Sequence, residues 1–483
     1  MVTIGDRALF VGANLYVTLG LGIRKHDVSS IIVRTIAWDL RSAAYPLSED
    51  TMRYTTLPLL VGIFLAATSR RDPSPLGPSF DPGIANHASV TTPSSGPWAR
   101  IVEGETGPGS LYALYIPQNW NGQAVYYAHG VRPPVPFAPI SLDNQDNFFE
   151  VRDALGALGY AFAYSSFSEN GLAVKDGAQR THQLSGLLTS ELHQQPRRNY
   201  LAGYSLGALV ALELAERFPT QYDGVLAMCG TVGGTVRELQ YVGDVRALFD
   251  AYYPGVLPGT VISAPSTPLT VAQVQALVIG AITPTPERPD AALRLFAIAS
   301  TAQTPLAYLP MGSLGDPSSP AFQTLVGSLI TALYYQLLGT PDVVDRTHGH
   351  SPYDNRKTIY TMGTPAVPVP QLVPVIEGMI AASNESVTRY DITPDAQNYL
   401  QNYYVPSGDV KIPIVSVHNL WDPLVPFFHE PALAEIMGPQ VASRMLLQRS
   451  VANYGHCNFT TDRVVSSFQS LVDWVATGVK PTS

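Results

Sequence analysis

The stretch that decides the fold is Asn199-Tyr-Leu-Ala-Gly-Tyr-Ser-Leu-Gly-Ala-Leu-Val210, which contains the pentapeptide Gly203-Tyr-Ser-Leu-Gly207. An apolar run enters this pentapeptide, and a helical pattern over residues 208–218 leaves it. In such a strand–turn–helix context, Gly-x-Ser-x-Gly leaves the serine hydroxyl exposed on a sharp turn. Small residues two positions before and after the serine allow the turn without a Cβ clash. We therefore predict that Ser205 is a nucleophile at a helix N-terminus, where the helix dipole favours developing negative charge.

A serine nucleophile needs a base and an orienting acid, which follow such a turn in the chain order Ser, Asp/Glu, His. Residues 412–418 form an apolar, β-branched run that predicts a buried strand, and Asp422 lies in the turn behind it. Residues 445–451 predict another strand, and His456 lies on the short loop beyond. Open α/β sheets place their sites at the C-terminal ends of strands. We predict Asp422 as the acid and His456 as the base.

Other residues could compete for these roles. His418 lies inside the strand pattern and is expected to be a packed core histidine, whereas His429 could line the site. His348 and His350 lie in a Pro/Gly-rich segment and have no further metal ligands nearby. Asp409 precedes its strand instead of following it. None of these residues fits the required order as well as Asp422 and His456.

Three of these segments together resemble the α/β-hydrolase superfamily: the serine turn, Asp422-Pro-Leu-Val-Pro426 and Gly455-His-Cys-Asn-Phe459. More narrowly, they are similar to secreted bacterial serine esterases and peptidase-like hydrolases that end in a GHC-x-F loop, a helix and a Trp-Val-x-x-Gly-x-x-Pro tail. Here the tail is Trp474-Val-Ala-Thr-Gly-Val-Lys-Pro481. The resemblance covers roughly residues 98–230 and 411–483 and is weak between them. It implies a large cap insertion and hydrolysis that needs no cofactor or metal.

An oxyanion hole can also be expected. Its first donor would be the backbone N–H of Leu206, directly after the nucleophile. The second would come from the loop after the third predicted strand, whose His129-Gly130 terminus resembles the oxyanion signature of the family. We assign this donor to Val131, with Gly130 allowing a close approach. The longer His-Gly-Gly-Gly form is absent, because Arg-Pro-Pro follows Val131, which argues against a close kinship with esterases and lipases that carry it.

Alternating strand and helix patterns predict an α/β-hydrolase fold, with a mostly parallel sheet and helices on both faces. Strands are expected at residues 99–105, 110–116, 124–128, 160–165, 199–203, 224–229, 412–417 and 445–451. Helices are expected at residues 144–158, 178–192, 206–218, 431–437 and 460–477. The catalytic domain would comprise residues 98–230 and 411–483. Residues 231–410, after the sixth strand, are too many for a simple connection and predict a mainly helical lid or cap, with helices near residues 245–253, 271–282, 291–302 and 321–338.

The N-terminal region predicts export. Residues 52–68 have a basic start, a short apolar stretch and a small-residue end, which is a signal-peptide pattern. A Pro/Ser-rich linker is expected over residues 69–97. Residues 1–51 form an uncertain extension, and we favour Met52 as the true start. A membrane anchor made of two apolar patches is the alternative, but neither patch reaches the length of a spanning helix.

Composition excludes several classes of protein. The 483 residues include 29 Lys and Arg against 38 Asp and Glu, a formal net charge of −9, so a phosphate backbone would be repelled and no nucleic-acid partner is expected. No dinucleotide loop, phosphate-binding Gly-rich loop or Cys/His zinc spacing is present. The 41 prolines and 39 glycines fit a loop-rich protein that is secreted or periplasmic. No stable membrane insertion is expected after processing, and the oligomeric state stays open.

The chain contains only two cysteines. Cys229 ends the sixth predicted strand and Cys457 follows His456. In this fold the loop that carries the histidine crosses the end of the sixth strand, so a Cys229–Cys457 disulfide is predicted, which would persist in an oxidising compartment. Two buried free thiols are the alternative.

The function that we expect is that of a secreted serine hydrolase, which cleaves small-molecule or polymeric carboxylic esters through an acyl-enzyme intermediate; a polyester- or feruloyl-type esterase is one alternative. A secreted aminopeptidase-like serine hydrolase is the other alternative. It would need an acidic pair in the cap to hold a substrate ammonium, with candidates at Glu287, Asp290, Glu377 and Glu385. A non-catalytic binding relative is disfavoured by the intact Ser, Asp and His pattern.

Overall fold

The computed structural model describes residues 89–93, 95–107, 109–134, 138–143, 147–265, 267–363, 370–403 and 405–482. The predicted signal peptide, the extension before it and residues 69–88 of the predicted linker lie outside the described residues. Met52, the expected start of the chain, is among them.

A nine-stranded sheet forms the centre of the catalytic part, in the order β1-β2-β3-β5-β4-β6-β7-β8-β9. The pairs from β1 to β3, and β3 with β5, are antiparallel, and all the other pairs are parallel. This arrangement is the mostly parallel α/β sheet that the alternating sequence pattern predicts. The strands are β1 (Ser89–Thr91), β2 (Trp98–Thr106), β3 (Ser110–Pro117), β4 (Gln123–Ala128), β5 (Ala161–Ser165), β6 (Arg198–Tyr204), β7 (Gly224–Met228), β8 (Ile414–Trp421) and β9 (Leu446–Tyr454).

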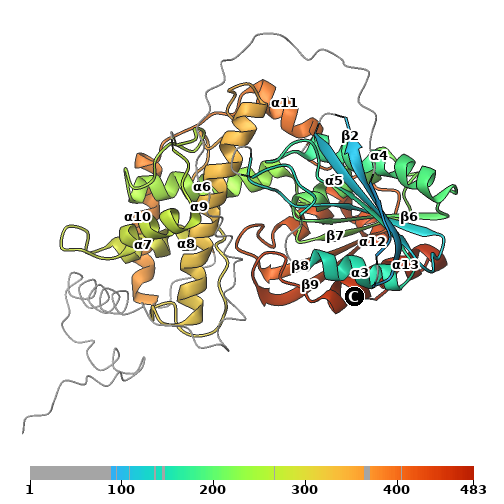
Figure 1. Ribbon diagram of the computed structural model, residues 1–483. Coiled ribbons are helices and arrows are strands. Elements are labelled where there is room, and N and C mark those ends of the chain that lie inside the picture. The colour runs from blue at the N-terminus through green and yellow to red at the C-terminus, as the bar shows by residue number, and fades with distance from the viewer. Residues whose placement is uncertain are drawn as a thin grey trace, which may run out of the picture.

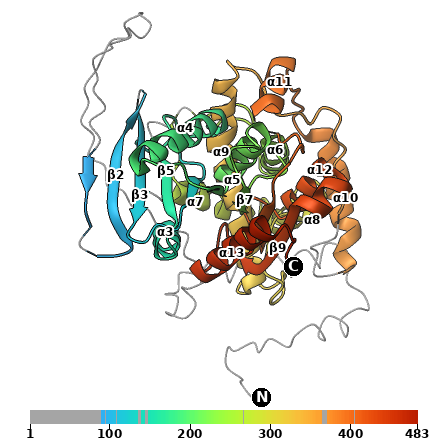
Figure 2. The same ribbon diagram turned by 90° about the vertical axis from the view of Figure 1, so that its right-hand side faces the viewer.

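Helices cover both faces of this sheet, as Figures 1 and 2 show. One face packs against α3 (Phe148–Ala157) and α13 (Thr461–Thr477), and the other against α4 (Val174–Leu192), α5 (Leu206–Arg217) and α12 (His429–Met445). Alternate residues of β7 therefore enter two separate apolar clusters: Val225 and Ala227 enter one, and Leu226 and Met228 the other. Strands buried on both faces need continuous apolar runs, and this is why the sequence of β7 shows no polar alternation.

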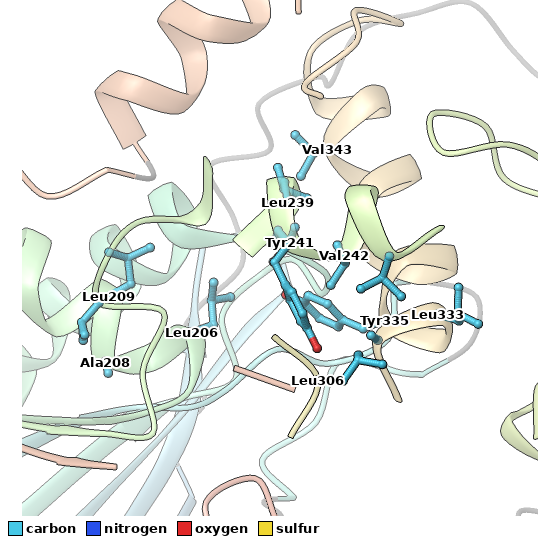
Figure 3. Packing of buried hydrophobic residues seen from close by; sticks show 14 of the residues in the cluster. Leu206, Ala208, Leu209, Leu239, Tyr241, Val242, Leu306, Leu333, Tyr335 and Val343 are labelled. Atoms are coloured by element: carbon cyan, nitrogen blue, oxygen red, sulfur yellow. The ribbon is translucent and has the colours of Figure 1, made fainter. Parts of the chain in front are cut away.

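The helical insertion, the segment between β7 and β8, contributes α6 (Thr235–Tyr252), α7 (Val271–Ile282), α8 (Ala291–Ser300), α9 (Pro320–Arg346), α10 (Val373–Ser386) and α11 (Pro394–Tyr403). It lies beside one end of the sheet (Figure 1). Its apolar core continues into the catalytic part, because Leu206 of α5, Tyr241 of α6 and Tyr335 of α9 belong to one cluster (Figure 3).

Several elements differ from the sequence predictions. β1 lies within the segment predicted as a linker and pairs antiparallel with β2. Three residues are too few to show a period in the sequence. α10 and α11 were missed, because α10 begins beside Pro374 and α11 is largely polar. The strand that ends at the acid turn is also longer than predicted, since β8 extends to Trp421.

α9 is the only helix of the described part of the chain that is long and apolar enough to cross a membrane, judged by length and composition. Of its apolar window, 61% is buried within the protein, and buried core helices pass the same test.

Candidate active site

Ser205 lies at the junction of β6 and α5. Its backbone has φ 55° and ψ −123°, a conformation that non-glycine residues rarely adopt and that costs of order 1–3 kcal/mol. The flanking glycines are required by close packing. A Cβ on Gly203 would lie 2.1 Å from the Gly207 carbonyl oxygen, and a Cβ on Gly207 would lie 2.0 Å from that of Ala128. The local sequence thus forces a strained turn that presents the serine side chain, as the pentapeptide predicts.

Asp422 and His456 are brought together from separate loops. Asp422 follows β8 and His456 follows β9, and His456 Nδ1 lies 2.8 Å from Asp422 Oδ2. The Asp422 carboxylate is fully buried, and its Oδ1 accepts hydrogen bonds from the backbone N–H groups of Leu424 and Val425, both at 2.9 Å. Because a carboxylate only accepts, Nδ1 of His456 carries the proton. In the neutral imidazole, the other ring nitrogen, Nε2, is the one that can accept a proton.

The histidine loop is fixed to the sheet edge beside Ser205. Cys457 forms a disulfide with Cys229, with Cα atoms 5.2 Å apart. Cys229 directly follows β7, and the backbone N–H of Ser205 donates to the carbonyl of the preceding residue, Met228 (2.8 Å). His456 Nε2 is buried without a hydrogen-bond partner among the described residues. A Ser205–His456 hydrogen bond is therefore not formed here, and such bonds are often long without a substrate.

The loop after β4 approaches the nucleophile. A Cβ on Gly130 would lie 3.1 Å from the Cβ of Ser205 and 3.7 Å from its Oγ, so Gly130 is adjacent to the reacting hydroxyl. Val131 follows and is half-buried. The carbonyl of Arg132 accepts from the N–H of Gly171 (2.8 Å), and its guanidinium donates to the carbonyls of Ser141 and Asp143. These contacts anchor the residue that directly follows Val131, the predicted second oxyanion donor.

His129 helps to hold this loop in place. It is buried, stacks on Phe167 with ring centroids 3.8 Å apart, and lies 2.6 Å from the Gly130 carbonyl through Nδ1. Burial, with a smaller contribution from Arg132, lowers the pKa of His129 to about 3. The imidazole is therefore neutral at physiological pH and acts as part of the support.

The other candidate histidines occupy different environments. His418 is fully buried, as expected for a core residue, but it contacts Glu430 and lies 3.7 Å from Asp422. His429 is fully buried too. Its Nδ1 accepts from the Gly233 N–H (3.1 Å), so its Nε2 donates to Glu238 (3.0 Å).

The His348–His350 pair is more exposed to solvent than these buried histidines. His348 is exposed, and His350 is partly exposed and lies 3.5 Å from Asp395. In the described part of the chain, the one cluster with metal-ligand spacing is Cys229, His456 and Cys457. Both of its sulfurs are bonded to each other, so neither is a thiolate that could bind a metal.

Glu238, which lies in the insertion, is not among the site residues that the sequence predicts. It is fully buried on α6, and its pKa is raised well above the usual range by burial and then by the charge of Asp422. In the sequence, Glu238 stands out because it is a charged residue on a helix face that is otherwise apolar.

A cavity of about 370 Å³ adjoins the acid loop. Its walls come from the insertion loop around Leu306 and from the loop that carries Asp422. Most of the lining is apolar or aromatic: Pro305, Leu306, Ala307, Tyr308, Pro310, Leu420, Trp421, Asp422, Pro426, Phe427 and Phe428.

Comparisons with known proteins give one family match and several remote structural likenesses. A family described as "Putative esterase" matches residues 156–265, which contain the Ser205 turn. Solved structures resemble the chain at low identity. Feruloyl esterase B from Aspergillus oryzae is 13% identical, covering 82% of this chain and 88% of its own, with a TM-score of 0.41. Candida antarctica lipase A is 14% identical, covering 83% and 80%, with a TM-score of 0.36. A search of curated proteins found no match.

Similarities this remote do not transfer a substrate from one protein to another. The esterase family match contains the serine turn, and that turn lies on a mostly parallel α/β sheet with helices on both faces.

Proposed function

We propose that the protein is a secreted serine hydrolase that cleaves carboxylic esters through an acyl-enzyme intermediate. The observation that carries this proposal is the Asp422–His456 pair, which a disulfide fixes at the sheet edge where Ser205 stands on a strained turn. The esterase family match over the same turn supports an ester as the substrate.

The mechanism follows from these positions. Ser205 attacks the ester carbonyl while His456 Nε2 takes its proton, and Asp422 stabilises the imidazolium. The backbone N–H groups of Leu206 and Val131 hold the oxyanion. His456 then protonates the departing alcohol, and water repeats the sequence to release the acid.

The cavity beside the acid loop favours an apolar or aromatic group on the ester, because apolar walls accept such groups at little desolvation cost. We expect the helical insertion to act as a lid that shapes this pocket and excludes water.

A peptidase reading has less support. Glu287, Glu377 and Glu385 are exposed, and Asp290 lies 3.1 Å from Arg294 in an ion pair. An exposed or already paired carboxylate holds an ammonium group weakly, so these residues give the peptidase reading little support.

Export is supported by the disulfide, because such bonds persist mainly in oxidising compartments. The predicted signal peptide would direct the chain there.

The test compares wild type with Ser205→Ala and His456→Ala on p-nitrophenyl esters and on aminoacyl-p-nitroanilides. Each variant should lose at least about 10³-fold in kcat/KM on esters while keeping its thermal unfolding midpoint. Ser466→Ala, which removes an exposed hydroxyl of α13, is the matched control and should keep full activity. A Ser205→Ala protein with near-normal ester turnover would overturn the proposal, and faster cleavage of the anilides would favour the peptidase reading.

A further inference from the structure

Asp422 lies between two imidazoles. Its Oδ2 is 2.8 Å from His456 Nδ1 on one side and 3.7 Å from His418 Nε2 on the other. His418 belongs to β8 and is fully buried. The proposed triad uses only the contact between Asp422 and His456.

The surroundings of His418 require protons on both ring nitrogens. Its Nδ1 lies 3.1 Å from Glu430 Oε1, and its Nε2 lies 2.8 Å from the Val425 carbonyl oxygen. A carbonyl oxygen cannot donate, so Nε2 carries a proton. Glu430 also accepts from the hydroxyl of Ser416 (2.6 Å) and the amide of Gln448 (2.7 Å). Both of these groups donate, so the Glu430 oxygens act as acceptors in this cluster, and His418 Nδ1 is placed to donate to Oε1 as well.

Electrostatics agree with this hydrogen-bond pattern. Burial would lower the pKa of His418, but the hydrogen bond and charge of Glu430, followed by the charge of Asp422, outweigh it and raise that pKa. His418 therefore lies in a buried row between the carboxyl groups of Glu430 and Asp422, and His456 ends that row.

We propose that His418, held as a cation by Glu430, is a positioning residue that acts through Asp422 and limits how strongly Asp422 draws a proton onto His456. This proposal rests on the proposed triad. A carboxylate with no cation behind it would stabilise the imidazolium form of His456 more strongly. His456 would then be protonated, and useless as a base, up to a higher pH. His418 thus keeps the base free near neutral pH.

Other titratable groups of this buried cluster do not replace that charge. Burial raises the pKa of Glu238 and Tyr241 well above their usual ranges and that of Tyr454 to about 12, and it lowers the pKa of His429 well below its usual range. These shifts favour the neutral form of all four groups. Arg237, whose charge also acts on His429, is partly exposed and paired with Glu435 (3.0 Å).

The experiment is the pH profile of kcat/KM on a soluble p-nitrophenyl ester. In His418→Gln the apparent pKa of the acid limb should rise by about 0.5–1 unit, because the positive charge beside Asp422 is lost. Glu430→Gln should shift the limb in the same direction, because His418 loses the carboxylate that holds its proton. Ser466→Ala is the matched control: it removes an exposed hydroxyl of α13 outside this cluster, and its acid limb should stay in place.

An acid limb that is unmoved or lowered in His418→Gln would overturn the proposal, since a purely structural role changes the height of the profile and not its position. A measurement on the wild-type protein does not depend on the variants folding. Nitrogen-15 NMR of labelled histidine should show both His418 ring nitrogens protonated at pH 7.5, and a single neutral tautomer there would also overturn it. Failure of the triad itself is recognised separately, by an active Ser205→Ala protein.

Discussion

Removing the Cys229–Cys457 disulfide should cost both stability and activity. The bond joins positions separated by 228 residues, and both cysteines are buried. In the chain-entropy model, a loop of that length gives about 5 kcal/mol at 25 °C, whereas disulfides typically contribute about 2–4 kcal/mol. We therefore expect Cys229→Ala/Cys457→Ala to lose about 2–5 kcal/mol of unfolding free energy.

The loss should appear as a lower unfolding midpoint. At about 2 °C per kcal/mol for a chain of this size, the midpoint in differential scanning fluorimetry should fall by about 5–10 °C. Each single alanine variant should fall as far as the double variant, because each breaks the same bond. Activity at 25 °C should fall as well, since the bond holds the loop that carries His456 next to the sheet edge.

Two control measurements test whether loss of the disulfide is the cause of these changes. Reductant should destabilise the wild type and leave the double variant unchanged, and denatured wild type should show no free thiol. A double variant with the wild-type midpoint, or two titratable thiols in freshly exported protein, would refute the argument.

Three further variants test other parts of the structure. Leu306→Trp should fill the cavity beside the acid loop and lower kcat/KM for aromatic and long-chain esters by about tenfold, with little change for acetates; equal losses on both would contradict the pocket assignment. Tyr241→Phe removes a buried hydroxyl without a hydrogen-bond partner among the described residues, so chemical denaturation should show an unfolding free energy that is unchanged or up to about 1 kcal/mol higher; a loss above that would show that the hydroxyl is bonded. Burial raises the pKa of Asp244 to about 6, although hydrogen bonds from Tyr353 and other groups oppose the shift. A raised pKa means that the folded state binds the proton more tightly, so wild-type stability should fall as the pH rises from about 4 to about 6. Asp244→Asn should lack this step and be more stable by about 3 kcal/mol at pH 8. Identical pH profiles of the unfolding midpoint in wild type and Asp244→Asn would contradict this prediction.

The sequence alone determined the elements that local patterns encode. The pentapeptide around Ser205 predicts a strand–turn–helix junction from five consecutive residues, and its glycines suit that turn because an added Cβ would lie 2.0–2.1 Å from backbone oxygens. Asp422 and His456 could be located because each follows an apolar run, and chain order then distinguished them from the other acids and histidines. The Cys229–Cys457 pair followed from the order of strands in that fold.

Only the tertiary structure decided which side chains surround the site. His418 looked like a core residue, yet the packing of α12 on β8 places Glu430 against it and leaves Asp422 3.7 Å away on the other side. Glu238 meets His429 although 191 positions separate them. Such contacts depend on how helices pack on a sheet, and burial makes them matter because charges without partners are costly there. Sequence periodicity records which face of an element is buried, but not which polar groups meet across the interface.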